Sequence, residues 1–582
     1  MNSRKKQYQL ILLLITLCLL TACQPLSEQS STPIPATIAI PILTTASPTT
    51  QPPDDIIING PTEAAVSIQT HHFRQEPVCS GTFIASDLDH ITMVPGGDTV
   101  QMFEANGGGV GINDLDRDGR LDIVLANHRD PNTILWNEGL DPARQIRFKS
   151  QRIGRGDARG VTIVDVDSDG LLDIVFSRRV SAPNYWRNLG DRNFEQITLA
   201  GVTKPLYAID WGDIDQDGDL DLVGGTYDAA LLAEFGQEFL TSTKAGVYLY
   251  TQNNNSFSEE PLILSAQALA LILVDFSGDQ RLDILVGNDF GVPDYAWRRN
   301  VPGAVNSWQR LDLPIMSHNT MSYAAADIDN NGTLELFSTD MQPYASDAET
   351  MAAWQPLLET LITDMEPQIN ANVLRETRFS NRAEALGIAA TGWSWSGKFG
   401  DLDQDGFEDL YVVNGMIEAT TFAHLPDHEL REKNQALRNS GGASFVPVPE
   451  WGLGSIESGR GMSMADIDGD GDLDIVINNL RGPAQFFENQ LCGGSTLLVD
   501  LAWLESANPF AIGTLLRLRT TDGQQHQRRI HAASGYLSSD PTQIHFGFAN
   551  DVRLAGLEII WPDGVRSIVT EISPNTRIEI TR

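Results

Sequence analysis

Cysteine is scarce in this chain, with only four residues among 582. So few cysteines exclude a disulfide-dense miniprotein and a zinc array built from many cysteines. Basic residues are also few, since 40 Lys and Arg face 77 Asp and Glu and leave a formal net charge of −37. A chain this acidic lacks the basic face that binds nucleic acid, and it is poorly suited to electrostatic docking on anionic lipid. The acidic side chains must therefore face water or hold cations.

The amino terminus has the pattern of an export signal. Residues 4–6 are Arg-Lys-Lys, and the apolar run at 10–20 has the length of a signal-peptide core. The sequence Leu-Thr-Ala-Cys that ends at Cys23 resembles a bacterial lipobox, which implies a lipoprotein signal peptide at 1–22 and lipidation of Cys23. Cleavage of an ordinary signal peptide nearby is the alternative. The lipobox predicts an exported protein, lipid-anchored on the outer side of the bacterial cytoplasmic membrane or cell envelope.

A low-complexity segment follows the export signal. Residues 24–56 are rich in Ser, Thr, Pro and Gln and contain almost no aromatic residues. Such a segment cannot bury enough apolar surface to fold. We therefore expect residues 23–76 to form a disordered tether that lifts the rest of the chain off the membrane.

An acidic motif, Asp-x-Asp-x-Asp-Gly-x-x-Asp, occurs seven times after the tether, with successive copies beginning 48–74 residues apart. The fourth copy is weakened, because Ser277 replaces an Asp and Gln280 stands where Gly is expected. The candidate metal ligands, copy by copy, are Asp114, Asp116, Asp118, Arg120 and Asp122; Asp165, Asp167, Asp169, Leu171 and Asp173; Asp213, Asp215, Asp217, Asp219 and Asp221; Asp275, Ser277, Asp279 and Asp283; Asp327, Asp329, Asn331, Thr333 and Glu335; Asp401, Asp403, Asp405, Phe407 and Asp409; and Asp466, Asp468, Asp470, Asp472 and Asp474.

This pattern matches the coordination chemistry of calcium, which takes six to eight hard oxygen ligands. Side chains at positions 1, 3, 5 and 9 of a tight loop can converge on one ion, and position 7 adds a backbone carbonyl. Gly at position 6 permits the positive φ that curls the loop around the ion. Without a cation, such close carboxylates would repel one another. We expect up to seven calcium ions, with the site at 275–283 the weakest; magnesium is less suited, because it keeps its waters.

The flanking sequences distinguish these loops from EF-hands. An EF-hand needs a Glu at position 12 and a helix on either side. Position 12 is Leu125 in the first copy and Phe176 in the second, and the runs at 121–125 and 172–176 are strand-like. Asp and Gly also favour ordinary turns. Recurrence in seven copies, each followed by a similar strand, favours calcium-binding β-hairpin loops.

The repeat period predicts the fold. Repeats of about 50 residues with four short strands indicate propeller blades, so we expect an all-β, seven-bladed propeller over 77–492. The last repeat lacks a fourth strand, and the strand that begins at Thr82 precedes the first blade, so we expect this strand to complete blade seven. Cys79 and Cys492 flank the missing connection and are predicted to form a disulfide. Two unrelated buried thiols are the alternative.

Two long intervals between motifs hold insertions. Residues 343–390 contain a segment at 347–365 with apolar side chains at helical spacing, and residues 417–440 contain a polar stretch. Insertions in a propeller gather on its faces, where they can recognise a partner. Covering a hydrophobic edge is an equally good explanation.

The last ninety residues lose the acidic motif and show strand-like alternation, which predicts a small β domain at 493–582. The sequences 511–513, 534–538, 545–547 and 561–564 resemble the ASPIC/UnbV domain of the cartilage acidic protein family. The acidic repeats resemble the FG-GAP or VCBS repeats of the integrin-α propeller. These resemblances imply structural calcium and a binding role, whereas Asn508-Pro-Phe510 and Phe548-Ala549 depart from the family pattern.

Signatures of catalysis are missing, since no G-x-S-x-G, P-loop or dinucleotide glycine motif occurs in context. We therefore expect no enzyme, but a calcium-binding, surface-anchored lipoprotein that acts as an extracellular binding or adhesion module for a protein or a glycan. The membrane contact is expected only through the lipid anchor, and nucleic acid is not expected as a partner. The alternatives are a glycan-active lyase or hydrolase on a calcium propeller and an envelope scaffold without a ligand.

Overall fold

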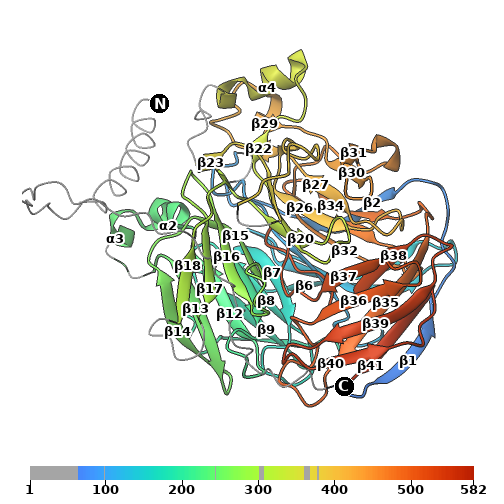
Figure 1. Cartoon of the computed structure of the whole chain (residues 1–582). Coiled ribbons are helices and arrows are strands. Elements are labelled where there is room, and N and C mark those ends of the chain that lie inside the picture. The colour runs from blue at the N-terminus through green and yellow to red at the C-terminus, as the bar shows by residue number, and fades with distance from the viewer. Residues whose placement is uncertain are drawn as a thin grey trace, which may run out of the picture. The chain divides into compact units, whose positions relative to one another are not determined.

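A computed structural model describes residues 63–582, apart from 97–98, 241, 243, 301–306, 359–366 and 377–378 (Figure 1). The predicted signal peptide, the lipidation site Cys23 and the tether up to residue 62 lie outside the described residues. In the part of the chain that the structure describes, no helix has the length and apolar character needed to cross a membrane.

Seven antiparallel sheets follow one another along the chain and confirm the predicted seven-bladed β-propeller. Their strands are β3 (Val110–Asn113), β4 (Asp122–Leu125), β5 (Asn132–Leu140) and β6 (Ile146–Ile153); β7 (Ala158–Val164), β8 (Asp173–Arg178), β9 (Asn184–Asn188) and β10 (Phe194–Ile197); β11 (Ala208–Gly212), β12 (Asp221–Gly225), β13 (Val247–Asn253) and β14 (Ser256–Ile263); β15 (Ala268–Val274), β16 (Asp283–Asn288), β17 (Tyr295–Arg299) and β18 (Trp308–Leu311); β20 (Tyr323–Ala326), β21 (Glu335–Ser338) and β24 (Val373–Arg375); β26 (Ser396–Gly400), β27 (Asp409–Val413), β30 (Gln435–Asn439) and β31 (Phe445–Pro447); and β32 (Gly459–Ala465), β33 (Asp474–Asn479), β34 (Pro483–Glu488) and β2 (Ile84–Ile91). The first strand of each blade contacts the first strand of the next, and β32 contacts β3, so the ring closes. Blade 5 departs from the predicted four strands, because its sheet has three within the described residues.

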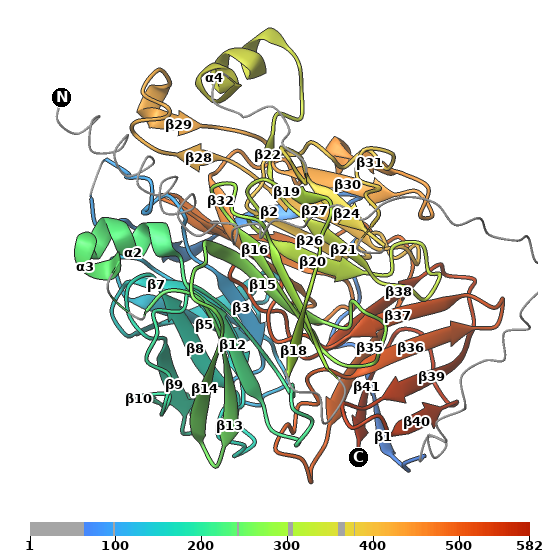
Figure 2. The same cartoon turned by 60° about the vertical axis from the view of Figure 1, so that its left-hand side comes forward.

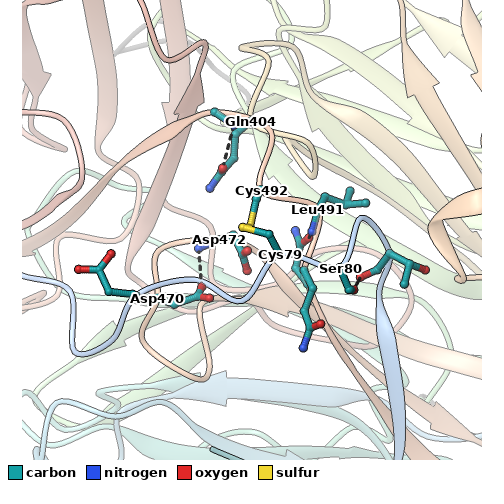
Figure 3. Close-up of a disulfide and its surroundings, with 12 residues drawn as sticks. Cys79, Ser80, Gln404, Asp470, Asp472, Leu491 and Cys492 are labelled. Carbon is teal, nitrogen blue, oxygen red and sulfur yellow. Dashed lines mark hydrogen bonds between the residues drawn. A yellow bond between two sulfur atoms is a disulfide. The ribbon is translucent and has the colours of Figure 1, made fainter.

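Blade 7 joins the two ends of the propeller. Its outer strand β2 comes from the amino-terminal side and pairs antiparallel with β34, with Ile84 opposite Glu488. Beside this pairing, Cys79 and Cys492 form a disulfide with their Cα atoms 5.5 Å apart (Figure 3). The β2–β34 pairing and the Cys79–Cys492 disulfide therefore lie where the sequence predicted that the ring closes.

The carboxy-terminal segment forms two further sheets, whose orders are β37-β36-β39-β40 and β1-β41-β35-β38. Their strands are β35 (Ser495–Ala502), β36 (Leu515–Thr520), β37 (Gln525–Arg529), β38 (Ile544–Phe548), β39 (Leu554–Ile560), β40 (Arg566–Val569), β41 (Thr576–Thr581) and β1 (Ser67–His72). We call residues 493–582 together with β1 the end domain. The predicted tether is wrong for its last part, because β1 pairs with β41 along its whole length, from Ser67 opposite Thr581 to His72 opposite Thr576. The open edge of β41 offers backbone partners that hold this polar, exposed strand.

The end domain is not separate from the propeller. The described residues from 63 onward belong to one compact unit, so the boundary expected between 492 and 493 is not a break between independent bodies. One hydrophobic cluster combines Trp211 and Tyr250 of blade 3 with Leu497, Phe546 and Trp561 of the end domain. Burial of large aromatic side chains on both sides makes this a strong interface.

Residues 531–543, within the connection between β37 and β38, enter the centre of the ring, and we call them the plug. It contacts the first strand of every blade. In blades 1 to 3, the Ser539 N–H donates to the Val110 carbonyl (2.9 Å), the Leu537 carbonyl accepts from the Val161 N–H (3.0 Å), and the Ala533 N–H donates to Asp210. In blades 4 and 5, Leu537 packs against the core around Leu271, and the Gly535 N–H donates to the Tyr323 carbonyl (2.9 Å). In blades 6 and 7, the Tyr536 N–H donates to Ser396 Oγ (3.1 Å), and the Ser539 carbonyl accepts from Ser463 Oγ (2.9 Å). The plug therefore ties all seven blades to the end domain.

The remaining elements connect second to third strands, or one blade to the next. They are α2 (Asp228–Phe235), α3 (Gln237–Leu240), α4 (Ala348–Leu358), the 3-10 turns η1 (Pro426–His428) and η2 (Pro449–Trp451), and the short strands β19 (Met316–Ser317), β22 (Met341–Gln342), β23 (Gln368–Ile369), β25 (Gly392–Trp393), β28 (Met416–Ile417) and β29 (Glu429–Leu430). In an antiparallel blade, these connections lie at the opposite end from the hairpin between strands one and two. Figures 1 and 2 show α2, α4 and β29 away from the end domain. We call the two ends of the ring the insertion face and the loop face.

The predicted insertion helix is present as α4, which ends at Leu358. Its Trp354 is fully buried, lies 6.2 Å from the ring of Trp393, and donates to Glu432 Oε1 (3.0 Å). The helix therefore covers an apolar part of blade 6. This agrees with the alternative explanation that the insertions cover a hydrophobic edge. The predicted positions 361 and 362 lie outside the described residues.

Candidate metal centres

Each acidic motif forms the hairpin between the first and second strands of a blade, so all seven loops lie on the loop face. In the first loop, the position-1 carboxylate of Asp114 accepts the N–H groups of Asp118 (3.1 Å) and Gly119 (2.8 Å). The backbone turns sharply at positions 4 and 6, where Arg117 and Gly119 have φ of 60° and 79°. The same two positions are left-handed in the other loops, which explains why Gly recurs at position 6.

The position-9 carboxylate fastens the loop to its blade. Asp122 accepts the Leu115 N–H (3.2 Å) and the Asn137 N–H (2.8 Å), and Asp173 accepts from Val166 (3.0 Å) and Asn188 (2.7 Å). These bonds orient the carboxylate toward the loop interior before any ion binds. Position 9 therefore begins the second strand and serves as a ligand at the same time.

The structure brings the predicted acids together. In six clusters, three potential ligand atoms lie within 4.8 Å of one another. Five of these clusters are Asp114, Asp116 and Asp122; Asp165, Asp167 and Asp173; Asp213, Asp215 and Asp221; Asp327, Asp329 and Glu335; and Asp401, Asp403 and Asp409. Burial, with repulsion from Asp116 and Asp114, raises the pKa of Asp122 to about 8. Protons or a cation are needed to relieve this crowding.

Unpartnered buried oxygens show that a cation fits. Asp167, Asp329 and Asp403 occupy position 3 in three loops, and Oδ1 of each is buried without a hydrogen-bond donor. The other oxygen of each is held by an arginine, with N–O distances of 2.6 Å to Arg187, 3.3 Å to Arg382 and 2.5 Å to Arg438 respectively. Burying a carboxylate oxygen without a partner is costly. A hard cation within the loop would supply the missing partner, and an all-oxygen ligand set suits calcium.

Two other loops show the same deficit. Oδ1 of Asp213 and Asp219 in the third loop, and Oδ1 of Asp472 in the seventh, are buried without donors. Asp219 and Asp472 occupy position 7 of these loops. The motif predicts their backbone carbonyls as ligands, and their side chains also join the acidic group. In the seventh loop, burial and the charges of neighbouring aspartates raise the pKa of Asp474 well above its ordinary value.

The fourth loop differs as its sequence suggests. Asp283 accepts the Ser277 N–H (2.6 Å), as Asp221 accepts the Asp215 N–H in the third loop (3.1 Å), but it also accepts the Ser277 hydroxyl (3.3 Å), which replaces the position-3 carboxylate of the other loops. Gln280 adopts a φ of 66°, a conformation that is strained for a residue with a side chain. Weak binding at 275–283 stays a prediction with this physical basis. In the first loop the carboxylates are also engaged, because Arg192 binds Asp116 (2.6 Å).

Four asparagines that were not among the predicted site residues link neighbouring loops. The Asn188 side chain donates to the Leu115 carbonyl of blade 1 (2.9 Å), and Asn439 donates to the Ile328 carbonyl of blade 5 (2.8 Å). Asn137 and Asn489 make the same bond to Ile467 and Leu402 (both 2.8 Å). In blades 1, 2 and 7 the asparagine follows position 9 by fifteen residues, a spacing visible in the sequence.

The end domain and the adjoining segment at 73–75 cover the loop face. They touch loop after loop: Arg577 donates to the Gly119 carbonyl (3.3 Å), Ser168 to the Ala507 carbonyl (2.7 Å), Ser506 to the Gly218 carbonyl (3.4 Å), His526 to the Gly406 carbonyl (3.1 Å), Gln404 to Thr496 (2.8 Å), and Arg74 to the Gly469 carbonyl (2.9 Å). Ions held in the five loops that make these contacts would lie beside the end domain, where they would stiffen the assembly.

Comparisons with known proteins agree with these features. The family described as FG-GAP-like repeat matches residues 114–176, 165–224, 275–338 and 428–477, and the family described as ASPIC and UnbV matches 504–582. The chain carries FG-GAP-like repeats and an ASPIC and UnbV domain. The resemblance predicted from the sequence is confirmed by both matches, and the ASPIC and UnbV match begins within the end domain.

Curated relatives span most of the chain. It is 25% identical to cartilage acidic protein 1 of Mus musculus over 507 residues, covering 81% of this chain and 73% of the relative. Identity to the Homo sapiens protein of that name is 26% over 506 residues, covering 78% and 69%. Solved structures with similarity include BBS1N in complex with ARL6DN, at 9% identity and a TM-score of 0.36, and the Neurospora crassa Pan2 WD40 domain, at 7% and 0.36. Each of these two alignments covers 71% of this chain and 98% of the other.

Proposed function

We propose that the protein is an exported, lipid-anchored binding module, whose propeller is stiffened by calcium and whose insertion face engages an extracellular protein or glycan. The observation that carries the proposal is the set of buried carboxylate oxygens without donors in the acidic loops. Calcium would be held by the side chains at positions 1, 3, 5 and 9 and by the carbonyl at position 7. Its role is structural, because the end domain covers the loops.

The position of the end domain supports assigning recognition to the insertion face. The loop face is occupied by intramolecular contacts, whereas the connections with α2, α4 and β29 project from the other face (Figure 2). Connections of variable length on a rigid scaffold are the usual place for binding residues. The FG-GAP-like repeats and the relatives named cartilage acidic protein 1 are compatible with a binding role.

A glycan array and an extracellular-protein array, probed with the same protein, test this function. The protein is the chain without residues 1–22, with Cys23→Ser to prevent lipidation. We expect specific, saturable binding in calcium that is lost in chelator. Mass spectrometry of the bound glycans is the second readout. Released products would show that the protein is a glycan-active enzyme and not a binding module. Absence of binding on both arrays would contradict the proposal and favour an envelope scaffold.

A further inference from the structure

Two arginines are buried on the insertion face without a carboxylate partner. Arg159 is the second residue of β7 in blade 2 and is 1% exposed, and Arg460 is the second residue of β32 in blade 7 and is fully buried. Within the described residues neither forms an ion pair, whereas the buried Lys398 pairs with Asp540 and Arg528 pairs with Glu408 at 3.1 Å. Arg460 donates to the carbonyls of Ala105 (2.7 Å), Gly415 (3.1 Å) and Gly459 (2.7 Å), and Arg159 donates to the Ala158 carbonyl (3.1 Å). These neutral acceptors satisfy N–H groups but do not neutralise the buried charge, which is costly without a counter-ion. Two of them in one region indicate a site that lacks its counter-charge.

The acids nearest in electrostatic influence are already engaged. Asp157, which acts on Arg159, pairs with Arg178 at 3.4 Å. Glu429, which acts on Arg460, pairs with Arg431 at 2.9 Å. The tyrosine between the arginines cannot serve as an anion, because burial raises the pKa of Tyr536 well above its ordinary value. The protein therefore provides no counter-ion of its own.

Further unpartnered polar atoms lie in the same region. Nε of Arg159, Nδ2 of Asn106 and both ring nitrogens of His128 are buried without hydrogen-bond partners. Burial and the charges of Arg159 and Arg460 hold the pKa of His128 well below its ordinary value. Two positive charges, the unpartnered N–H groups of Arg159 and Asn106, and the single N–H of a neutral His128 suit a ligand that accepts hydrogen bonds.

The plug forms the floor of this region and aromatic rings lead outward from it. The hydroxyl groups of Tyr536 and Tyr207 lie 3.4 Å apart, and the ring of Tyr536 lies 5.1 Å from that of Trp395. The Arg460 guanidinium lies over Trp395, 4.4 Å from its ring centre. Tyr207 contacts Tyr227, which stacks at 6.0 Å on Phe290, a residue that is 39% exposed. A series of packed aromatic rings therefore extends from the cationic group to the partly exposed Phe290.

From this arrangement we propose that the insertion face binds an oxyanion, a carboxylate or sulfate group carried by the ligand, between Arg159, Arg460 and His128 above Tyr536. Guanidinium groups bind such planar or tetrahedral oxyanions through paired hydrogen bonds. In a chain with a formal net charge of −37, a positive centre discriminates strongly in favour of a ligand whose negative group can reach it. The inference deepens the proposed binding role, because it specifies the chemistry of the ligand.

The direct test is calorimetric titration of the chain without residues 1–22, carrying Cys23→Ser, in calcium. Sodium sulfate and sodium glucuronate represent the two sources of the oxyanion, sodium chloride at equal ionic strength controls for screening, and glucose controls for an uncharged sugar. We expect saturable binding of sulfate, glucuronate or both, and none of glucose. The anion that binds more tightly identifies the source. Binding of neither anion would overturn the inference.

Variants locate the site. Arg159→Gln and Arg460→Gln should each weaken anion binding at least tenfold, whereas Arg298→Gln, which removes the same charge from an exposed position in blade 4, should leave it unchanged. Equal affinity in Arg159→Gln and Arg298→Gln would contradict the assignment. Because a buried arginine variant can fail to fold, crystals of the unaltered body grown in sodium selenate give an independent answer. We expect an anomalous peak within hydrogen-bonding distance of Arg159 or Arg460, and its absence there would reject the site.

The outcome is separable from that of the proposed function. Specific array binding together with no anion binding would reject the anion site alone. Anion binding together with silent arrays would leave the site standing and reject the array-based function.

Discussion

Replacing one aspartate in the third loop should change the stability of the protein by different amounts with and without calcium. Oδ1 of Asp213 is buried without a donor, and burial, with repulsion from Asp217 and Asp215, raises the pKa of Asp213 to about 6. Relative to an ordinary value of 3.8, this corresponds to a cost of at most about 3 kcal/mol for holding the ionised group in the folded protein. In chelator, Asp213→Asn removes this cost and should stabilise the protein.

In calcium the same substitution removes a ligand. At about 1 mM calcium, a site with a Kd of about 10 µM stabilises the folded state by about 2.7 kcal/mol. A hundredfold loss of affinity would leave about 0.4 kcal/mol of that contribution. Asp213→Asn should therefore lower the stabilisation that calcium provides by about 2 kcal/mol, and in calcium this loss offsets most or all of the gain seen in chelator.

Thermal unfolding of the unaltered protein and the variant, each in calcium and in chelator, measures both effects. We expect Asp213→Asn to rise or stay level in Tm in chelator, and to gain clearly less Tm from added calcium than the unaltered protein does. Asp279→Asn in the fourth loop is the control and should gain as much Tm from calcium as the unaltered protein, because that loop is expected to bind weakly. Equal shifts for Asp213→Asn in both buffers would refute the reasoning.

Three further predictions concern the ring, the plug and the acidic loops. Cys79→Ser should reduce stability by up to about 6 kcal/mol, because the Cys79–Cys492 bridge spans 413 residues, and an unchanged urea midpoint would contradict a closing role. Tyr536→Ala should cost about 3–5 kcal/mol and expose the end domain to limited proteolysis, while proteolysis identical to that of the unaltered protein would argue against the plug. In the calcium-free protein, burial raises the pKa of Asp122 to about 8 and that of Asp173 to about 7. The calcium-free protein therefore loses stability as the pH rises from about 4 toward these values. Calcium binds the ionised carboxylates, so its stabilising effect grows over the same pH range. The difference in Tm between calcium and chelator should therefore be larger at pH 8 than at pH 5.5, and a constant difference would count against carboxylate ligation.

The repeated parts of the structure could be predicted because their signals are local. Asp114 and Gly119 lie within one hairpin, so the spacing alone indicates a loop that converges on a cation. Ring closure by the strand after Cys79 followed from a count of strands. The confirmed family resemblance also depends on short motifs.

The parts that escaped prediction depend on contacts between distant segments. Strand β1 is polar and short, and its partner β41 lies about 500 residues away, so nothing in Ser67–His72 itself indicates a strand. The motif around Tyr536 was visible, but its place in the centre of the ring follows from how the end domain docks on seven blades at once. The cationic group at Arg159 and Arg460 is assembled from blades 2 and 7 and could not be read from either repeat.

Metal analysis of the purified body tests the central claim most directly. After equilibrium dialysis at about 0.1 mM free calcium, tenfold above a Kd of about 10 µM, inductively coupled plasma mass spectrometry of the protein, corrected for the dialysate, should find calcium bound in a molar ratio of about six, one ion for each acidic cluster. Chelation should remove it with a fall in Tm. Protein that contains less than one calcium ion per chain, and whose Tm is unaffected by added calcium, would contradict the account.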